Sequence, residues 1–179
     1  KTLKEISDNL GKSSEEVLCE LLIASNLQVI IFMHTIDEVA LEMAIAHPLS
    51  IIASSGAGYN YITRRDDSSS DLPHPRSFGT FPRLLNRYVK DRKIISLENA
   101  ISKITSRPAQ IFRINKRGLI KESYFADITI FDFKSIKDKA TFKNPYQYSQ
   151  GINGVIVNGV LVYKNGSFVK NYPGTVLRA

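Results

Sequence analysis

The chain has 179 residues, of which 43% are hydrophobic and 23% are charged, and this balance excludes an intrinsically disordered protein. No apolar run approaches the roughly 18 to 20 residues that span a bilayer, and the first residues lack the apolar segment of a signal peptide. We therefore expect no membrane partner. The net charge is +7, from 24 basic and 17 acidic residues, but the basic residues are scattered and not interleaved with aromatic residues. We therefore expect no nucleic-acid partner either.

Two further features bear on cellular context and completeness. The single cysteine, Cys19, excludes an internal disulfide framework, so we expect a cytoplasmic protein. The chain opens directly on a helical pattern without an initiator methionine, which predicts a piece of a longer polypeptide.

The first third of the chain is predicted to alternate helices with short apolar strands. Gly11 ends a first helix, Ser13 and Glu16 form a capping box for a second, and Thr35 can cap a third, which His47-Pro48 ends. The predicted helices cover residues 3–10, 14–25 and 36–46, and the predicted strands cover 27–33 and 50–53. Continuously apolar strands that alternate with helices are typical of an α/β fold with a parallel sheet. Two such strands cannot form a stable sheet, so we expect the others to precede this chain.

A long loop rich in Gly, Ser, Asp and Pro follows, over residues 54–77. It comes directly after a predicted strand, where α/β folds place their active sites. Helices are predicted over 81–92 and 96–105, the second capped by Ser96, and a short helical stretch over 109–112.

The last part of the chain is predicted to be a small antiparallel β unit. Strands are expected over 126–132, 152–157 and 160–163, with a further turn at 164–166 leading into 167–169. Asn158-Gly159 is a strong hairpin signal between two apolar runs. The boundary between the two parts falls near residues 105–113.

Several short motifs run in order along nearly the whole chain. The motifs are His74-Pro75-Arg76-Ser77-Phe78-Gly79-Thr80-Phe81-Pro82-Arg83, Arg87-Tyr88-Val89, Ile104-Thr105-Ser106-Arg107-Pro108-Ala109, Asn144-Pro145-Tyr146 and Pro173-Gly174. Each is weak alone, but their order together resembles the N-acyl-D-amino-acid deacylases (D-aminoacylases) of the metal-dependent amidohydrolase superfamily. The resemblance implies the C-terminal part of a (β/α)8 barrel over residues 1–107, followed by part of a small β-sandwich over 108–179.

The resemblance also implies a chemistry, in which a zinc-bound water attacks an amide carbonyl and an aspartate on the last barrel strand takes its proton. The metal is held by histidines that include a His-x-His pair. This chain has three histidines, His34, His47 and His74, and no such spacing. We therefore assign no metal ligand here and expect the zinc ligands in a missing N-terminal portion of the same enzyme. The isolated chain is expected to be inactive.

Ser55 stands at the position that matches the family aspartate. A serine is no base at neutral pH without an activating partner and is a poor zinc ligand. Three interpretations stay open: the aspartate has been replaced, an aspartate of the following loop (Asp66, Asp67 or Asp71) takes its role, or this subgroup uses a different base.

Arg76 is the strongest candidate for a substrate-binding residue. The resemblance implies that it binds the α-carboxylate of an N-acyl-D-amino acid, and a guanidinium group suits two-point contact with a carboxylate. Pairing with a local acid such as Asp71 is the alternative. His74 is a second candidate, either for substrate binding or for orienting Arg76. A non-catalytic relative that binds an acidic small molecule is the alternative function.

Overall fold

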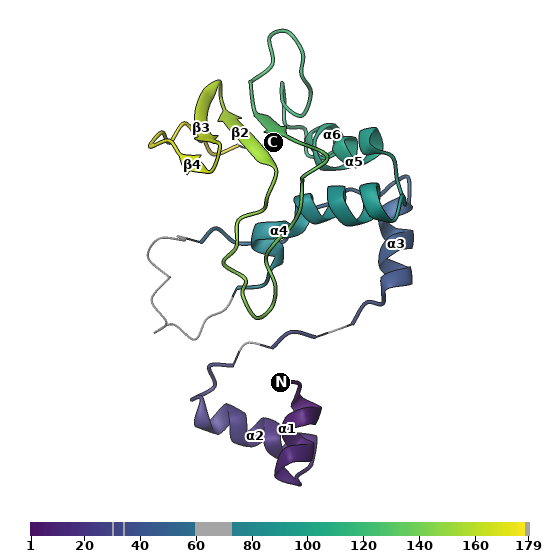
Figure 1. Cartoon of the computed structure of the whole chain (residues 1–179), viewed down its shortest axis with the longest axis vertical. Coiled ribbons are helices and arrows are strands. Elements are labelled where there is room, and N and C mark those ends of the chain that lie inside the picture. The colour runs from purple at the N-terminus through teal and green to yellow at the C-terminus, as the bar shows by residue number, and fades with distance from the viewer. Residues whose placement is uncertain (30, 34, 60–72, 178–179) are drawn as a thin grey trace. The chain divides into compact units, whose positions relative to one another are not determined.

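The computed structural model describes residues 1–29, 31–33, 35–59 and 73–177. The chain divides into two compact units, Lys1–Thr35 and Ile36–Ala179, whose elements can be followed by colour in Figure 1. Within the described ranges, no helix combines the length and the apolar character that a bilayer crossing requires.

The first unit contains two helices, α1 (Leu3–Leu10) and α2 (Ser14–Ala24). Both begin with a capping box, in which the side chains of Thr2 and Ser13 accept bonds from the amides of Glu5 and Glu16. Gly11 ends α1 with a φ of 62°, a left-handed conformation that glycine adopts without a steric cost. The predictions for these two helices are confirmed.

The strand predicted over residues 27–33 is wrong for the residues that the structure describes there. None of them is in a strand, and Leu27 has a φ of 64°, which lies outside the β region. An apolar run becomes a strand only when a neighbouring strand satisfies its backbone groups, and none of the described residues provides one.

The described residues of the second unit form five helical segments: α3 (Glu38–Ala46), α4 (Arg76–Arg83), the π-helix η1 (Leu84–Asp91), α5 (Leu97–Ile104) and α6 (Ser106–Ile111). Ser96 caps α5 and His47 ends α3, as predicted. The cap of α3 is Asp37 and not Thr35, because the Asp37 carboxylate lies within reach of the amide of Ala40, at 2.7 Å.

Two other helix boundaries differ from the prediction. The helix predicted from residue 81 already begins at Arg76, because Pro75 presets a helical backbone and needs no hydrogen bond of its own. Pro82 then removes one helical hydrogen bond, just before the wider π-helical spacing of η1 begins. The stretch predicted over 109–112 is part of α6, which begins at Ser106.

The predicted strand over 50–53 is also absent. The main-chain amide of Ile52 donates to the carbonyl of Lys103 in α5, at 3.1 Å, and not to a strand. The described residues hold no strand beside this segment, so a parallel ladder has no partner here.

The C-terminal β unit is confirmed as a single antiparallel sheet with the order β1-β2-β3-β4. Its strands are β1 (Ile128–Phe131), β2 (Ile152–Val157), β3 (Val160–Lys164) and β4 (Ser167–Phe168). Asn158 and Gly159 have φ values of 48° and 80°, as a two-residue hairpin turn requires. The first strand is shorter than predicted because Asp127 is held in a turn, where its amide donates to Phe125.

The core of the second unit lies between α3, η1, α5 and the turn that follows β1. Its buried members are Ile45, Leu84, Leu85, Tyr88, Val89, Ala100 and Ile136. Glu38 ties α3 to η1 by accepting bonds from Arg87 and Tyr88. This packing fixes the helices that precede and follow the segment carrying Ser55.

Candidate functional site

Ser55 is exposed and lies in a turn closed by a side-chain bond, directly after residues 51–53, which form neither a helix nor a strand. Its φ of 48° is left-handed, and the next amide, that of Gly56, donates to the Ser54 hydroxyl at 3.1 Å. A left-handed conformation is uncommon for residues other than glycine, although asparagine and aspartate adopt it more readily than most. The backbone at this position therefore suits an aspartate as well as a serine.

The turn packs against the first turn of α4. An added Cβ on Gly56 would lie 2.8 Å from the Cα of Ser77, so only glycine fits here without a shift. The amide of Ala57 also donates to the Ser77 hydroxyl at 3.3 Å. Because Arg76 precedes Ser77, this contact brings the Ser55 turn and the Arg76 backbone close together.

A hydrogen bond joins His74 and Arg76, in which the main-chain amide of Arg76 donates to the His74 side-chain Nδ1 at 3.0 Å. An accepting Nδ1 carries no proton, so this bond requires the neutral ring with its proton on Nε2. Partial burial and then the nearby Arg76 charge lower the pKa of His74. His74 also meets the Phe142 ring edge-on, with 5.0 Å between ring centres.

The Arg76 side chain is exposed, and no acidic group of the described residues forms an ion pair with it. The acid suggested as its local partner, Asp71, lies outside the described residues, as do Asp66, Asp67 and His34. Arg76 is thus a cation that an anionic ligand can approach from solvent.

An aromatic cluster holds the Ser55 segment, α4 and the segment before β2 together, and sequence reasoning missed it. Tyr59 stacks on Phe78 with 6.1 Å between ring centres, and Tyr146 meets both rings edge-on. The Ser149 hydroxyl also donates to the carbonyl of Phe78 at 2.9 Å. The Asn-Pro-Tyr motif contains Tyr146 and the motif that begins at His74 contains Phe78, but neither motif indicates that the two rings meet.

The described residues contain no group of three or more His, Cys, Asp or Glu side chains that could hold a metal ion. His47 lies at the end of α3, where its Nδ1 accepts a bond from the Leu49 amide at 3.2 Å. Neither His47 nor His74 therefore belongs to a metal centre formed within this part of the chain.

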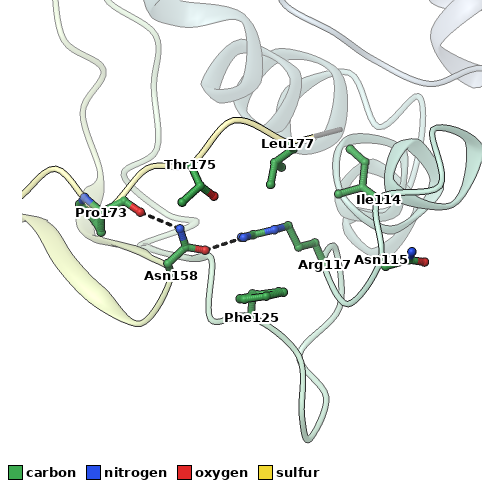
Figure 2. Close-up of a pocket in the computed structure, with 8 residues that line it drawn as sticks. All are labelled: Ile114, Asn115, Arg117, Phe125, Asn158, Pro173, Thr175 and Leu177. Carbon is green, nitrogen blue, oxygen red and sulfur yellow. Dashed lines mark hydrogen bonds between the residues drawn. The ribbon is translucent and has the colours of Figure 1, made fainter. Parts of the chain in front are cut away.

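A cavity of about 540 Å³ lies beside the β2–β3 turn and is lined by none of the predicted site residues. Figure 2 shows Arg117 directed toward Asn158, which in turn donates to the carbonyl of Pro173 at 2.7 Å. Arg117 also pairs with Asp127 and lies over the Phe125 ring, 4.2 Å from its centre. Because these polar groups are already bonded to one another, the cluster fastens the C-terminal tail to the sheet.

A comparison with models of known protein families shows to which family the chain belongs. The model of the amidohydrolase family matches residues 54–163, which include the Ser55 turn, Arg76 and most of the sheet. The chain belongs to the amidohydrolase family. This amidohydrolase chain is similar to a D-aminoacylase of Alcaligenes xylosoxydans xylosoxydans, with 35% identity over 98% of the chain and 33% of that relative. It is also similar to an N-acyl-D-aspartate deacylase of the same organism, with 32% identity over 97% of the chain and 32% of the relative.

The solved structures that are similar to this chain are also deacylases. A crystal structure of D-aminoacylase superposes with a TM-score of 0.80 at 34% identity, over 99% of this chain and 34% of that one. The N-acyl-D-glutamate deacylase of Bordetella bronchiseptica, complexed with zinc and a phosphonate inhibitor, gives a TM-score of 0.77 at 28% identity, over 100% of this chain and 34% of that one. This amidohydrolase chain spans about a third of the length of the relatives that it matches.

Proposed function

We propose that this amidohydrolase chain is the C-terminal part of a zinc-dependent enzyme that hydrolyses N-acyl-D-amino acids to a D-amino acid and a carboxylate. The similar proteins are a D-aminoacylase and deacylases of N-acyl-D-aspartate and N-acyl-D-glutamate, and one D-aminoacylase structure has a binuclear metal centre. The described residues do not supply a metal site, so in this proposal the metal ligands lie in the preceding portion of the enzyme. The chain alone is inactive.

In the complete enzyme, residues 1–107 would form the last βα units of a (β/α)8 barrel and residues 108–179 part of a β-sandwich. Apolar side chains on and around α3 support this arrangement, because they are exposed here and would be covered by neighbouring barrel elements. They are Ile36, Val39, Met43 and Leu49, with exposed fractions of 70%, 69%, 69% and 83%.

Arg76 would bind the substrate's α-carboxylate. The observation that carries this proposal is the packing of the Ser55 turn on the first turn of α4, at Gly56 and Ser77. It supports the proposal because it brings the backbone of an exposed cation close to Ser55, which we match to the family aspartate. A carboxylate held at Arg76 would be fixed relative to the reacting amide, which is how such a site distinguishes a D from an L substrate.

His74 would act through Arg76 rather than on the substrate. Its Nδ1 holds the Arg76 amide, so it fixes the backbone from which the guanidinium group extends. In this proposal His74 is a positioning residue.

Ser55 favours a second candidate function, a non-catalytic relative that binds an acidic small molecule. Such a protein would keep the Arg76 cation and lack the base, because a serine hydroxyl does not take a proton from water at neutral pH. The two functions share the carboxylate site and differ only in turnover.

The experiment that tests the carboxylate site compares Arg76→Gln with Arg83→Gln in the complete zinc-loaded protein. Arg83 lies about two helical turns later in α4 and pairs with Asp138, so it is a matched control. Loss of charge-assisted bonds worth about 1.5–3 kcal/mol should weaken binding of N-acetyl-D-amino acids about 10- to 150-fold for Arg76→Gln only, measured by titration calorimetry. Equal binding by both variants would contradict the proposal.

A further inference from the structure

Lys103 in α5 is a lysine that is almost fully buried, with 2% of its surface exposed. Its ammonium group donates to the carbonyl of His47, to the carbonyl of Ser50 at 3.1 Å and to the Ser50 hydroxyl at 2.6 Å. Among the described residues, no carboxylate pairs with it. A buried charge without a counter-charge is costly unless every donor is satisfied, and here three oxygen atoms match the three ammonium protons.

Arg107 in α6 binds the same short turn. Its guanidinium group donates to the carbonyl of Pro48 at 2.7 Å, between the two carbonyls that Lys103 holds. The His47 oxygen caps the end of α3, where the last carbonyls lack helical partners and carry partial negative charge. The Pro48 and Ser50 oxygens belong to the turn that follows. We call Lys103 and Arg107 together the carbonyl clamp.

The clamp holds the turn although its two cations repel each other. They lie on the consecutive helices α5 and α6, and like charges held close together repel each other. Burial and then the Arg107 charge lower the pKa of Lys103. The interaction with the turn must therefore outweigh both the repulsion and the loss of hydration.

The clamp also acts on the residues that lead to Ser55. The carbonyl of Lys103 accepts the amide of Ile52 at 3.1 Å, so one residue holds this segment by its side chain at Ser50 and by its main chain at Ile52. Ser55 follows Ile52 by only three positions. The contacts with Ser77 lie on the other side of Ser55, one and two positions after it, at Gly56 and Ala57.

We propose that the carbonyl clamp positions the Ser55 turn, holding it from the α5 side while Ser77 holds it from the α4 side. Lys103 and Arg107 are positioning residues and do not touch the substrate. The importance of this role for catalysis rests on the proposed function; the structural role does not.

The test is amide hydrogen exchange in the complete protein, read over residues 52–57, with the variants Lys103→Met and Lys103→Arg. Lys90→Met is the control, because Lys90 also binds backbone carbonyls, those of Lys134 and Ile136, away from this segment. Lys103→Met should speed exchange over 52–57 about tenfold or more, with η1 and β2 unchanged, and Lys103→Arg should restore part of the protection. Lys90→Met should leave residues 52–57 protected.

Unchanged exchange over 52–57 in Lys103→Met, or faster exchange spread evenly over the second unit, would overturn the proposal. Arg107→Met covers the case in which Lys103→Met does not fold. It removes the Pro48 bond, and with it a long contact to the Asn99 side chain at 3.5 Å that does not involve the turn. It should speed exchange over the same residues about threefold, as expected for one hydrogen bond to the turn. If Arg107→Met does not speed exchange over residues 52–57, the proposal is also overturned.

A kinetic measurement separates positioning from general stability. In the complete enzyme carrying Ser55→Asp, Arg107→Met should lower kcat for N-acetyl-D-amino acids about threefold or more with KM nearly unchanged, because the clamp holds the Ser55 turn and not Arg76. A rise in KM at constant kcat would contradict the positioning role. If the Ser55→Asp enzyme has no activity at all, the proposed function fails, and the exchange experiment still decides the clamp.

Discussion

Gly56 and Ser77 are in contact so close that a methyl group on Gly56 would come within 2.8 Å of the Ser77 Cα. The neighbour is backbone, at the first turn of α4, and cannot move aside as a flexible side chain could. Twenty-one residues separate the two positions, so the contact closes the long loop at its base. It also sets the distance between the Ser55 turn and the Arg76 backbone.

Gly56→Ala should therefore separate the turn from α4. We expect a loss of about 1–3 kcal/mol in the free energy of unfolding, as for other forced overpacking, measured by urea denaturation. Gly58→Ala is the matched control, because a Cβ on Gly58 meets no atom within 4 Å. Equal stability of the two variants would show that the contact at Ser77 does not constrain the turn.

The pKa of His74 predicts a dependence of stability on pH. Burial and the Arg76 charge lower this pKa, so the folded state binds the proton less readily than the unfolded chain. Stability should be constant above the ordinary histidine pKa of about 6.5 and should fall as the pH drops below it. Thermal melts at pH values from about 8 to about 5, on either side of this pKa, would show the loss of stability.

His74→Asn tests the origin of that loss. The Asn side chain carries an acceptor near the Nδ1 position but does not titrate, so this variant should lose less stability on acidification. His47→Asn is the control, because it removes an exposed imidazole that also accepts a bond from a main-chain amide. This variant should lose as much stability on acidification as the wild type. If the His74→Asn protein loses as much stability on acidification as the wild type, His74 is excluded as the source of the loss.

The pair of Arg117 and Asp127 should stabilise the join between the sheet and the C-terminal tail. Burial alone would raise the pKa of Asp127, but the Asn158 amide and Arg117 outweigh it and lower the pKa. Its contribution to stability should therefore be present above about pH 4 and be lost below it. Asp127→Asn should cost about 1–2 kcal/mol in urea denaturation near neutral pH, because Arg117 is left without its counter-charge.

Asp8→Asn is the control for this pair. It breaks the exposed pair of Lys4 and Asp8 on α1, in which both side chains face solvent, so we expect a change below about 1 kcal/mol. An effect of Asp127→Asn no larger than this control would contradict the role of the Arg117 cluster.

The elements predicted well from sequence are those with short-range chemical signals. The capping box at Ser13 and Glu16, the left-handed Gly11 and the Asn158-Gly159 turn each satisfy their backbone groups within a few residues. The segments 27–33 and 50–53 carry an equally strong apolar pattern, yet the described part of each is not a strand. A strand depends on a partner strand, and apolarity alone does not supply one.

The candidate site was predictable only in part, for a similar reason. Motif order pointed to Ser55 and Arg76, but no local pattern indicates that Ser77 meets Gly56 across the loop. The carbonyl clamp was missed because Lys103 looks like an ordinary basic residue in the last turn of a helix, and its partners lie more than fifty positions earlier. Contacts of this kind depend on packing, and no repeating pattern in the sequence marks them.

We propose that Ser55 of this amidohydrolase chain occupies the position of the base in the deacylase site of the complete enzyme. The most direct test is the steady-state rate of the complete zinc-loaded protein with N-acetyl-D-amino acids and their L enantiomers, before and after Ser55→Asp. Because a general base contributes about 10²- to 10⁴-fold, we predict that Ser55→Asp raises kcat at least about a hundredfold for the D substrates and leaves the L substrates unreacted. A variant that is no faster than the wild type, or that hydrolyses both enantiomers equally, would contradict the account.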